Sequence, residues 1–204
     1  MKKDSTLYVV LFTFIVCAVF VVVLAVANEG TKDLVAANKQ FATQSAVLGA
    51  LGIPYADAAE ASAKYAAEVT EAKTTDYRSW KAIVEGTSYA AVEQSGAGLW
   101  GTITIILAAT ADGENVRGVR VLAQLETPGL GGRIEEPWFL GQFEGEKSPG
   151  GKVAMKAGAE ASGKADADKA NGRVEGISGA TRTSQAFGSI VNAGLERIKA
   201  GGVK

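Results

Sequence analysis

An uncharged, strongly apolar stretch near the N-terminus constrains this chain more than any other feature. Residues 7–27 read LYVVLFTFIVCAVFVVVLAVA and contain no charged side chain. About 20 consecutive apolar residues are what an α-helix needs to cross the hydrocarbon core of a bilayer. Lys2 and Lys3 precede the stretch, and Lys32 and Lys39 follow it. This weak charge bias favours a cytoplasmic N-terminus, with the bulk of the chain outside the cytoplasm.

A cleaved signal peptide is the alternative interpretation of residues 7–27. Ala25-Val26-Ala27 has the small-residue form of a cleavage site. The apolar region of a signal peptide has only about 7–15 residues, however, and this stretch is longer. We therefore expect a permanent membrane helix.

The composition excludes several kinds of active site and partner. Among 204 residues there is no His and a single Cys, Cys17, which rules out Ser-His-Asp triads, Cys-His pairs and intrachain disulfides. No Asp-rich loop has the spacing of a cation site, so we expect no metal. The formal net charge of −1 gives no electrostatic basis for nucleic-acid binding. Redox work by such a chain would require an organic cofactor.

The segment after the apolar stretch predicts a stalk and a peripheral element. Apolar side chains recur at helical spacing over residues 34–51, and Gly52-Ile53-Pro54 would end that helix. Residues 56–73 are rich in Ala but have a thin apolar stripe, which favours a surface helix or an ordered loop. Tyr77 and Trp80 then mark the entry to the main domain.

Strands are predicted in the middle of the chain, where β-branched and apolar residues gather. Residues 101–110 and 116–127 form two such runs around Asp112-Gly113, a pair that is typical of a hairpin turn. Residues 89–94 are expected to supply the preceding strand. An antiparallel sheet follows from this arrangement.

The C-terminal part predicts a long loop and a final helix. Residues 148–172 are rich in Gly, Ala, Lys and Asp and indicate a surface loop with one strand-like piece at 152–156. Residues 173–177 suit a short last strand. From Thr183 onward apolar residues recur every three or four positions, which predicts an amphipathic helix that Gly201-Gly202 would end.

The stretch from Gly96 to Gly101, GAGLWG, matches the spacing G-x-G-x-x-G. A dinucleotide fingerprint requires a helix after this motif. Because a strand-like run follows here, we interpret the glycines as a turn with close backbone packing. Trp100 is then expected to be a core or pocket residue.

The stretch LETPGLGGR, residues 125–133, predicts a tight loop whose backbone can approach a ligand closely. Leu130 lies between glycines and could form the wall of a site for an aromatic ring system. The alternative interpretation is an ordinary turn, and the pattern alone does not choose between them.

The stretch SGAT, residues 178–181, lies between a short strand and the last helix. Unpaired backbone N–H groups and the helix dipole favour negative charge at a helix start, so this place suits a phosphate that is bound or esterified. Gly179 and Ala180 leave room around the Thr181 hydroxyl. The alternative is a helix cap formed by Thr181, Thr183 or Ser184.

Three motifs together point to a known family. GLWGTI, ETPGLGGRIEEPWFLGQFEG and GISGATRTSQAF follow one apolar helix in this order. In this combination the chain resembles the FMN-binding subunits of two related respiratory complexes. These are the C subunit of the Na⁺-translocating NADH:quinone oxidoreductase and the G subunit of the Rnf ferredoxin:NAD⁺ oxidoreductase. The N-terminal residues, the stalk and GLWGTI favour the first of these, whereas the length of the chain is nearer that of the Rnf subunit.

The resemblance implies FMN joined through its phosphate to the last Thr of S/T-G-A-T, which is Thr181 here. Thr183 is the alternative attachment point, and Glu175 stands where the family usually has Asp. Leu130 is expected against the flavin ring and Thr127 near its polar edge. The implied cofactor site consists of Thr181, Ser178, Gly179, Ala180, Thr183, Glu126, Thr127, Leu130, Gly131 and Trp100.

The resemblance also implies an α+β fold in which one transmembrane helix precedes a single FMN-binding domain with an antiparallel sheet and a C-terminal helix. The expected parts are a cytoplasmic segment 1–6, the membrane helix 7–27, a stalk with peripheral helices 28–75 and the FMN-binding domain 76–204. The domain would lie on the periplasmic face of the inner membrane.

In this interpretation the chain is an electron relay with no catalytic site of its own. Its expected partners are multispanning flavin and iron–sulfur subunits, the lipid bilayer and, during maturation, a flavin transferase. A membrane-anchored binding or structural module without a cofactor is the alternative from another functional class. A third interpretation is an extracytoplasmic carrier that works alone with a soluble partner.

Overall fold

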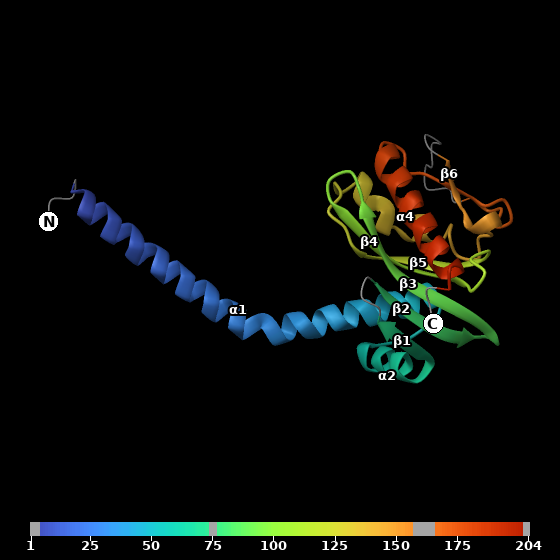
Figure 1. The fold of residues 1–204 in the computed structure, drawn as a ribbon, viewed down its shortest axis with the longest axis horizontal. Coiled ribbons are helices and arrows are strands. Elements are labelled where there is room, and N and C mark those ends of the chain that lie inside the picture. Colours follow the sequence, from blue (N-terminus) through green and yellow to red (C-terminus); the bar gives the residue numbers. More distant parts are fainter. Residues whose placement is uncertain (1–4, 74–76, 157–165, 202–204) are drawn as a thin grey trace. The chain divides into compact units, whose positions relative to one another are not determined.

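The computed structural model describes residues 5–73, 77–156 and 166–201 and divides into two compact units, Met1–Phe41 and Ala42–Lys204. The first unit consists of the exposed part of helix α1, which runs from Thr6 to Leu51 (Figure 1). An 18-residue window of α1 has a mean hydropathy of 3.3 and is not buried, so by length and composition the helix could cross a membrane. The predicted helix end is confirmed, because Gly52 follows with a φ of 71°.

The second unit is built around a five-stranded antiparallel sheet in which each strand pairs with the next along the chain (Figure 1). Its strands are β1 Val69–Lys73, β2 Arg78–Val84, β3 Thr87–Ala97, β4 Thr102–Thr110 and β5 Val116–Ala123. The predicted hairpin joins β4 to β5, and Gly113 N–H donates to the Thr110 carbonyl at 2.8 Å. The predicted α+β class with an antiparallel sheet is confirmed.

Strands β1 and β2 were not expected from the sequence. Helix α2, Ala58–Glu68, covers only the first part of the Ala-rich segment, and Asp57 caps it by accepting from Glu60 N–H at 2.8 Å. The chain then turns directly into β1, which pairs with β2. The compact unit begins at Ala42, because the end of α1 is buried against the sheet together with α2.

One face of the sheet is covered by helix α4, Thr181–Lys199. The side chains of Ile103, Ile105 and Leu107 point from β4 into this core. Three phenylalanine rings pack beside them, with Phe187 of α4 at 5.2 Å from Phe139 and 5.5 Å from Phe143 between centroids. Alternate residues of β4 thus supply the core under α4.

The opposite face is covered by residues 42–51 of α1 and by α2. Ala91, Ile106 and Ala108 face this second core, and Trp80 is its largest fully buried side chain. The β4 strand is therefore buried on both faces, which explains its nearly continuous apolar sequence.

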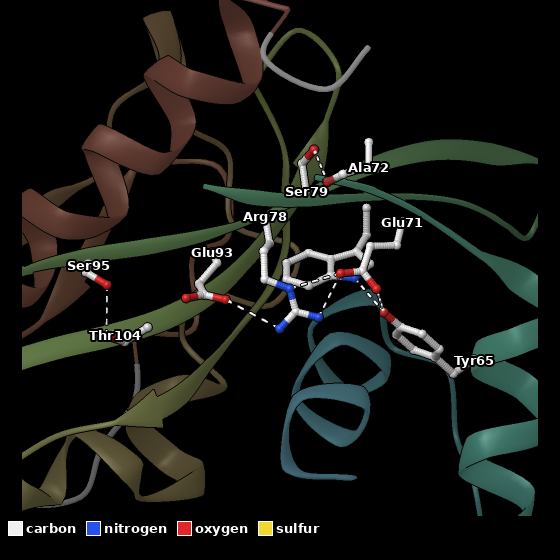
Figure 2. Close-up of polar contacts among 9 residues, drawn as sticks. Tyr65, Glu71, Ala72, Arg78, Ser79, Glu93, Ser95 and Thr104 are labelled. Atoms are coloured by element: carbon white, nitrogen blue, oxygen red, sulfur yellow. Dashed lines mark hydrogen bonds and ion pairs between the residues drawn. The ribbon is translucent and has the colours of Figure 1, made fainter. Parts of the chain in front are cut away.

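A polar network closes the rim of this second core (Figure 2). The Tyr65 hydroxyl accepts from the Trp80 indole N–H at 2.6 Å and donates to a Glu71 oxygen at 2.9 Å. The Arg78 guanidinium donates to the other Glu71 oxygen at 2.7 and 2.9 Å. These contacts fasten α2 to β1 and β2.

Short elements connect the sheet to α4. They are η1 Gly131–Glu135, α3 Pro137–Leu140, η2 Pro149–Gly151, β6 Ala154–Lys156 and β7 Arg173–Glu175. The two strand-like pieces predicted in this part are confirmed, and β6 pairs with β7 in parallel. Residues 157–165 of the predicted surface loop lie outside the described residues, as does Gly202 after the last helix. β5 ends at Ala123, four residues before the predicted end of that strand.

Candidate functional site

Three segments that are distant in sequence meet at the carboxylate of Glu126. Its Oε1 accepts from the backbone N–H of Leu99 at 2.9 Å and of Trp100 at 3.0 Å, both in the turn between β3 and β4. Its Oε2 accepts from the Thr183 hydroxyl, in the first turn of α4, at 2.6 Å. Glu126 itself begins the ETPGLGG loop and is only 5% exposed. One buried carboxylate therefore joins the three predicted motifs.

Two glycines make room for this carboxylate. A Cβ on Gly98 would lie 2.5 Å from Glu126 Oε1, and a Cβ on Gly131 would lie 2.7 Å from both Glu126 Oε2 and Thr183 Oγ1. Gly96 and Ala97 of the GAGLWG stretch end β3, and the predicted turn is formed by Gly98 to Gly101, where Gly98 N–H donates to the Gly101 carbonyl at 2.7 Å. Gly98 and Gly131 are needed here because a side chain at either position would collide with Glu126. The glycines of a dinucleotide fingerprint instead let the backbone approach a phosphate.

Hydrogen bonds keep Glu126 ionised in spite of its burial. Burial is the largest single influence and raises the pKa of the carboxyl, but the donors oppose it. Together the Thr183 hydroxyl and the backbone N–H groups of Trp100, Leu99 and Gly101 bring the pKa of Glu126 below its ordinary value. The carboxylate is therefore a fixed negative charge within the site.

The first turn of α4 presents one free hydroxyl and two engaged ones. Thr181 is exposed, and its side chain has no hydrogen-bond partner within the described part of the chain. Thr183 is 1% exposed and is bonded to Glu126. Ser184 accepts from Ile177 N–H at 2.9 Å and donates to the Ala180 carbonyl at 3.0 Å.

The interpretation of these hydroxyls as helix caps is wrong. The residue at the cap position is Ala180, and no side chain caps the helix start. Thr181 instead occupies the first helical position, two residues earlier than the predicted helix start. The early N–H groups of α4 therefore keep their capacity to attract an anion.

The ETPGLGG loop lies against the SGAT stretch. A Cβ on Gly179 would lie 3.4 Å from Leu130 Cδ2, in ordinary contact distance. Leu130 is 47% exposed, as an apolar wall for a ligand requires. The Thr127 carbonyl accepts from Leu130 N–H at 3.1 Å and from Gly132 N–H at 2.9 Å. Thr127 as a whole is exposed. Predicted site residues from two loops are thus brought together.

Trp100 is not a core residue, because it is 72% exposed. Its backbone N–H is bonded to Glu126, so its turn belongs to the same cluster of loops. Leu99 and Leu125 are also exposed here, and a Cβ on Gly101 would lie 3.0 Å from Leu125 Cβ. Sequence reasoning did not select these two leucines, although their position beside the glycine motifs was the available signal.

Glu175 lies on β7, before the SGAT stretch. One of its oxygens forms an ion pair with Lys156 at 2.9 Å. The other oxygen is buried and has no hydrogen-bond partner among the residues that the structure describes. The Glu175 backbone is held on both sides by Gln142, whose side chain accepts from its N–H and donates to its carbonyl.

The segment that contains all three motifs has a recognisable counterpart among known domains. Residues 98–196 match the FMN-binding domain family. This match spans just under half of the chain and includes the β3–β4 turn, the ETPGLGG loop and the first turns of α4. FMN is also the cofactor that the sequence resemblance implied.

Named relatives point to the same family. The C subunit of Na⁺-translocating NADH-quinone reductase from Vibrio anguillarum is 41% identical over 91 residues, which is 44% of this chain and 34% of the relative. Its counterpart from Yersinia pestis is 36% identical over 99 residues, 48% of this chain and 36% of the relative. The matched segment thus spans about a third of these curated relatives. The resemblance to C subunits that the motifs indicated is confirmed.

Solved structures share the fold over most of the chain. The crystal structure of the C subunit of Na⁺-translocating NADH-quinone reductase from Parabacteroides distasonis has a TM-score of 0.64 at 24% identity. It covers 82% of this chain and 95% of its own. NqrC from Shewanella oneidensis also has a TM-score of 0.64, at 20% identity, and covers 80% of this chain and 99% of its own. At these identities the likeness establishes the fold.

Proposed function

We propose that this chain carries FMN in a phosphoester bond to Thr181. In this proposal it relays electrons as the C subunit of a membrane-bound Na⁺-translocating NADH:quinone oxidoreductase. The match to the FMN-binding domain family and the names of the relatives support the cofactor and the complex. The chain itself needs no catalytic residue, because the bound flavin would supply the redox chemistry.

The observation that carries the proposal is the difference between two hydroxyls one helical half-turn apart. Thr181 is exposed and unbonded within the described residues, whereas Thr183 is buried and donates to Glu126. A modifying enzyme can reach the first hydroxyl on the folded surface. The second would have to leave its hydrogen bond and its buried position, so Thr181 is the attachment point that we propose.

The surroundings of Thr181 fit a flavin phosphate and ring. The first turn of α4 has no side-chain cap, and its N–H groups favour the negative charge of a phosphodiester. Leu130 lies beside Gly179 of the SGAT stretch and would offer an exposed apolar surface to the ring. Thr127 and Trp100 are the exposed residues that we assign to the rest of the wall, and Ser178 and Gly179 line the approach.

The proposed setting is the inner membrane. Helix α1 would span the bilayer once and hold the FMN domain on the periplasmic side, among multispanning flavin and iron–sulfur subunits. The length and hydropathy of α1 support the anchor. The curated relatives named as C subunits favour this complex over the Rnf complex, whose G subunit is the alternative.

A mass measurement tests the attachment. The full chain is co-expressed with a flavin transferase, and its intact mass and in-gel fluorescence are measured after denaturation. The wild-type chain is expected to carry one FMN, and Thr181→Ala is expected to carry none. Ser189→Ala is the matched control, because Ser189 is another exposed hydroxyl residue of α4 and should leave the labelling unchanged.

The alternatives give different results in the same experiment. Labelling of Thr181→Ala would move the attachment to Thr183 or elsewhere. A bare wild-type chain beside an active transferase would contradict the covalent proposal and favour an anchored module without flavin. Co-purification of multispanning subunits in mild detergent separates the complex from a carrier that works alone.

A further inference from the structure

The carboxylate of Glu126 connects the loop to two other segments of the chain. It lies below three surface segments and makes one hydrogen bond to Thr183 and two to the turn at Leu99 and Trp100. Glu126 and Thr183 are 57 positions apart, and Glu126 is 27 and 26 positions from the two turn residues. A single side chain of the ETPGLGG loop thus bonds both to the turn and to the start of α4.

The carboxylate of Glu126 is packed closely against two glycines. Added Cβ atoms on Gly98 and Gly131 would approach its two oxygens to 2.5 and 2.7 Å. Both distances are well inside van der Waals contact, so the carboxylate fits closely between two backbones. Loss of the side chain would therefore leave a void below the loops as well as unpaired donors.

Within the described part of the chain, Glu126 has no ion-pair partner that would neutralise its charge. None of the ion pairs among the described residues includes it, and Arg133, at the end of the same loop, pairs with Glu136 instead. Its donors are a hydroxyl and backbone N–H groups, which stabilise the negative charge without cancelling it. Because Glu126 is only slightly exposed to solvent, water screens its negative charge weakly, and the charge acts on a ligand bound beside it.

We propose that Glu126 is a positioning residue that fixes the walls of the flavin site through Thr183 and the Leu99–Trp100 turn, and that its charge lowers the reduction potential of the flavin. The second part rests on the function proposed above, since it requires FMN in this site. The first part concerns the protein alone. Electron uptake adds negative charge to the flavin, and a fixed carboxylate nearby disfavours that addition.

Two substitutions separate the two parts of the proposal. In Glu126→Gln the amide oxygen can still accept from Leu99 and Trp100, and the amide N–H group can donate to Thr183, so shape is kept and charge is lost. In Glu126→Ala both are lost. Glu135→Gln is the matched control, because Glu135 is an exposed acidic residue nine positions further along that the site does not use.

Amide hydrogen exchange on the full chain without flavin tests the positioning role. Exchange at Leu99 and Trp100 is expected to accelerate about tenfold or more in Glu126→Ala, because the acceptor of both N–H groups is gone. Glu126→Gln and Glu135→Gln are expected to keep wild-type protection. Unchanged exchange in Glu126→Ala would overturn the positioning role. Should that variant not fold, Thr183→Val removes only the donor to Oε2, and faster exchange at the same two amides remains the expected result.

A redox titration of the flavinylated chain tests the charge. Glu126→Gln is expected to retain attachment and to shift the flavin midpoint potential to more positive values, whereas Glu135→Gln is not. Equal potentials in the wild type and Glu126→Gln would overturn the electrostatic part. A wild-type chain without flavin would refute the proposed function itself, and the exchange measurement would still decide the positioning role.

Discussion

The two faces of the five-stranded sheet bury side chains of different size. One face is covered by α4, and the other is covered by the end of α1 and by α2. Under α4 the core contains Phe139, Phe143 and Phe187 together with the large aliphatic residues of β4. Under α1 and α2 the core consists largely of alanines and a few larger aliphatic side chains, and Trp80 is its one buried aromatic residue among those described. Rings fill the space below the candidate site, whereas small residues let helix backbones approach the sheet closely.

The two faces also treat their polar groups differently. On the α4 side the carboxylate of Glu126 is buried and is held by a hydroxyl and backbone donors. On the other side the polar network of Tyr65, Glu71 and Arg78 stays at the rim (Figure 2). The α4 face thus lies under the proposed cofactor site, whereas the opposite face holds the end of α1. Substitutions on each face test this division.

The largest effect is expected from Phe187→Ala. The ring is fully buried and packs against Phe139 and Phe143, so its loss should lower the free energy of unfolding by about 4 kcal/mol. Chemical denaturation of the full chain in detergent measures this change. Flavin attachment at Thr181 should fall as well, because Phe187 lies on the helix that presents the hydroxyl. Normal flavin attachment in a strongly destabilised variant would show that the proposed site does not depend on this core.

An intermediate effect is expected from Gly118→Ala on the other face. The added Cβ would lie 2.7 Å from the Ala50 carbonyl oxygen, so α1 and β5 must move apart. Overpacking of this kind should lower the free energy of unfolding by about 2 kcal/mol. Attachment should remain at the wild-type level, measured by in-gel fluorescence. Loss of attachment would show that the two faces are not independent.

The smallest effect is expected from Tyr65→Phe, which removes the partner of the Trp80 indole N–H and should cost about 1 kcal/mol at neutral pH. Burial and the hydrogen bond to Glu71 raise the pKa of Tyr65 to about 12. Because this pKa lies above the ordinary value of about 10, the contribution is complete below pH 10 and is lost as pH rises through about 12.

Unfolding free energies of the wild type and Tyr65→Phe, measured at pH 9 and near pH 12, check this dependence. The difference between the two proteins should shrink at the higher pH, since lysines titrate equally in both. A constant difference would contradict the raised pKa. Flavin attachment should not change at any of these pH values at which the fold persists.

Much of the fold could be predicted from the sequence because several signals are local. The apolar helix, the strand from residue 102, the turn at Asp112-Gly113 and the last helix each follow from neighbouring residues. β1 and β2 were not predicted, because β1 is short, charged residues interrupt the apolar pattern of β2, and the two strands are stabilised by their mutual pairing. Trp100 was partly misjudged, since a large aromatic residue beside glycines indicated a core or a pocket and its exposure rules out the core.

The sequence by itself determined which small-residue motifs exist, the apolar helix before them and the family resemblance that they carry together. Only the tertiary structure decided which hydroxyl at the start of α4 is free, because that depends on a contact between Thr183 and Glu126 across 57 positions. It also decided that Glu126 is buried, since no local pattern marks a carboxylate whose donors come from a distant turn and helix. Hydrogen bonds and close packing between remote segments form only when the chain has folded.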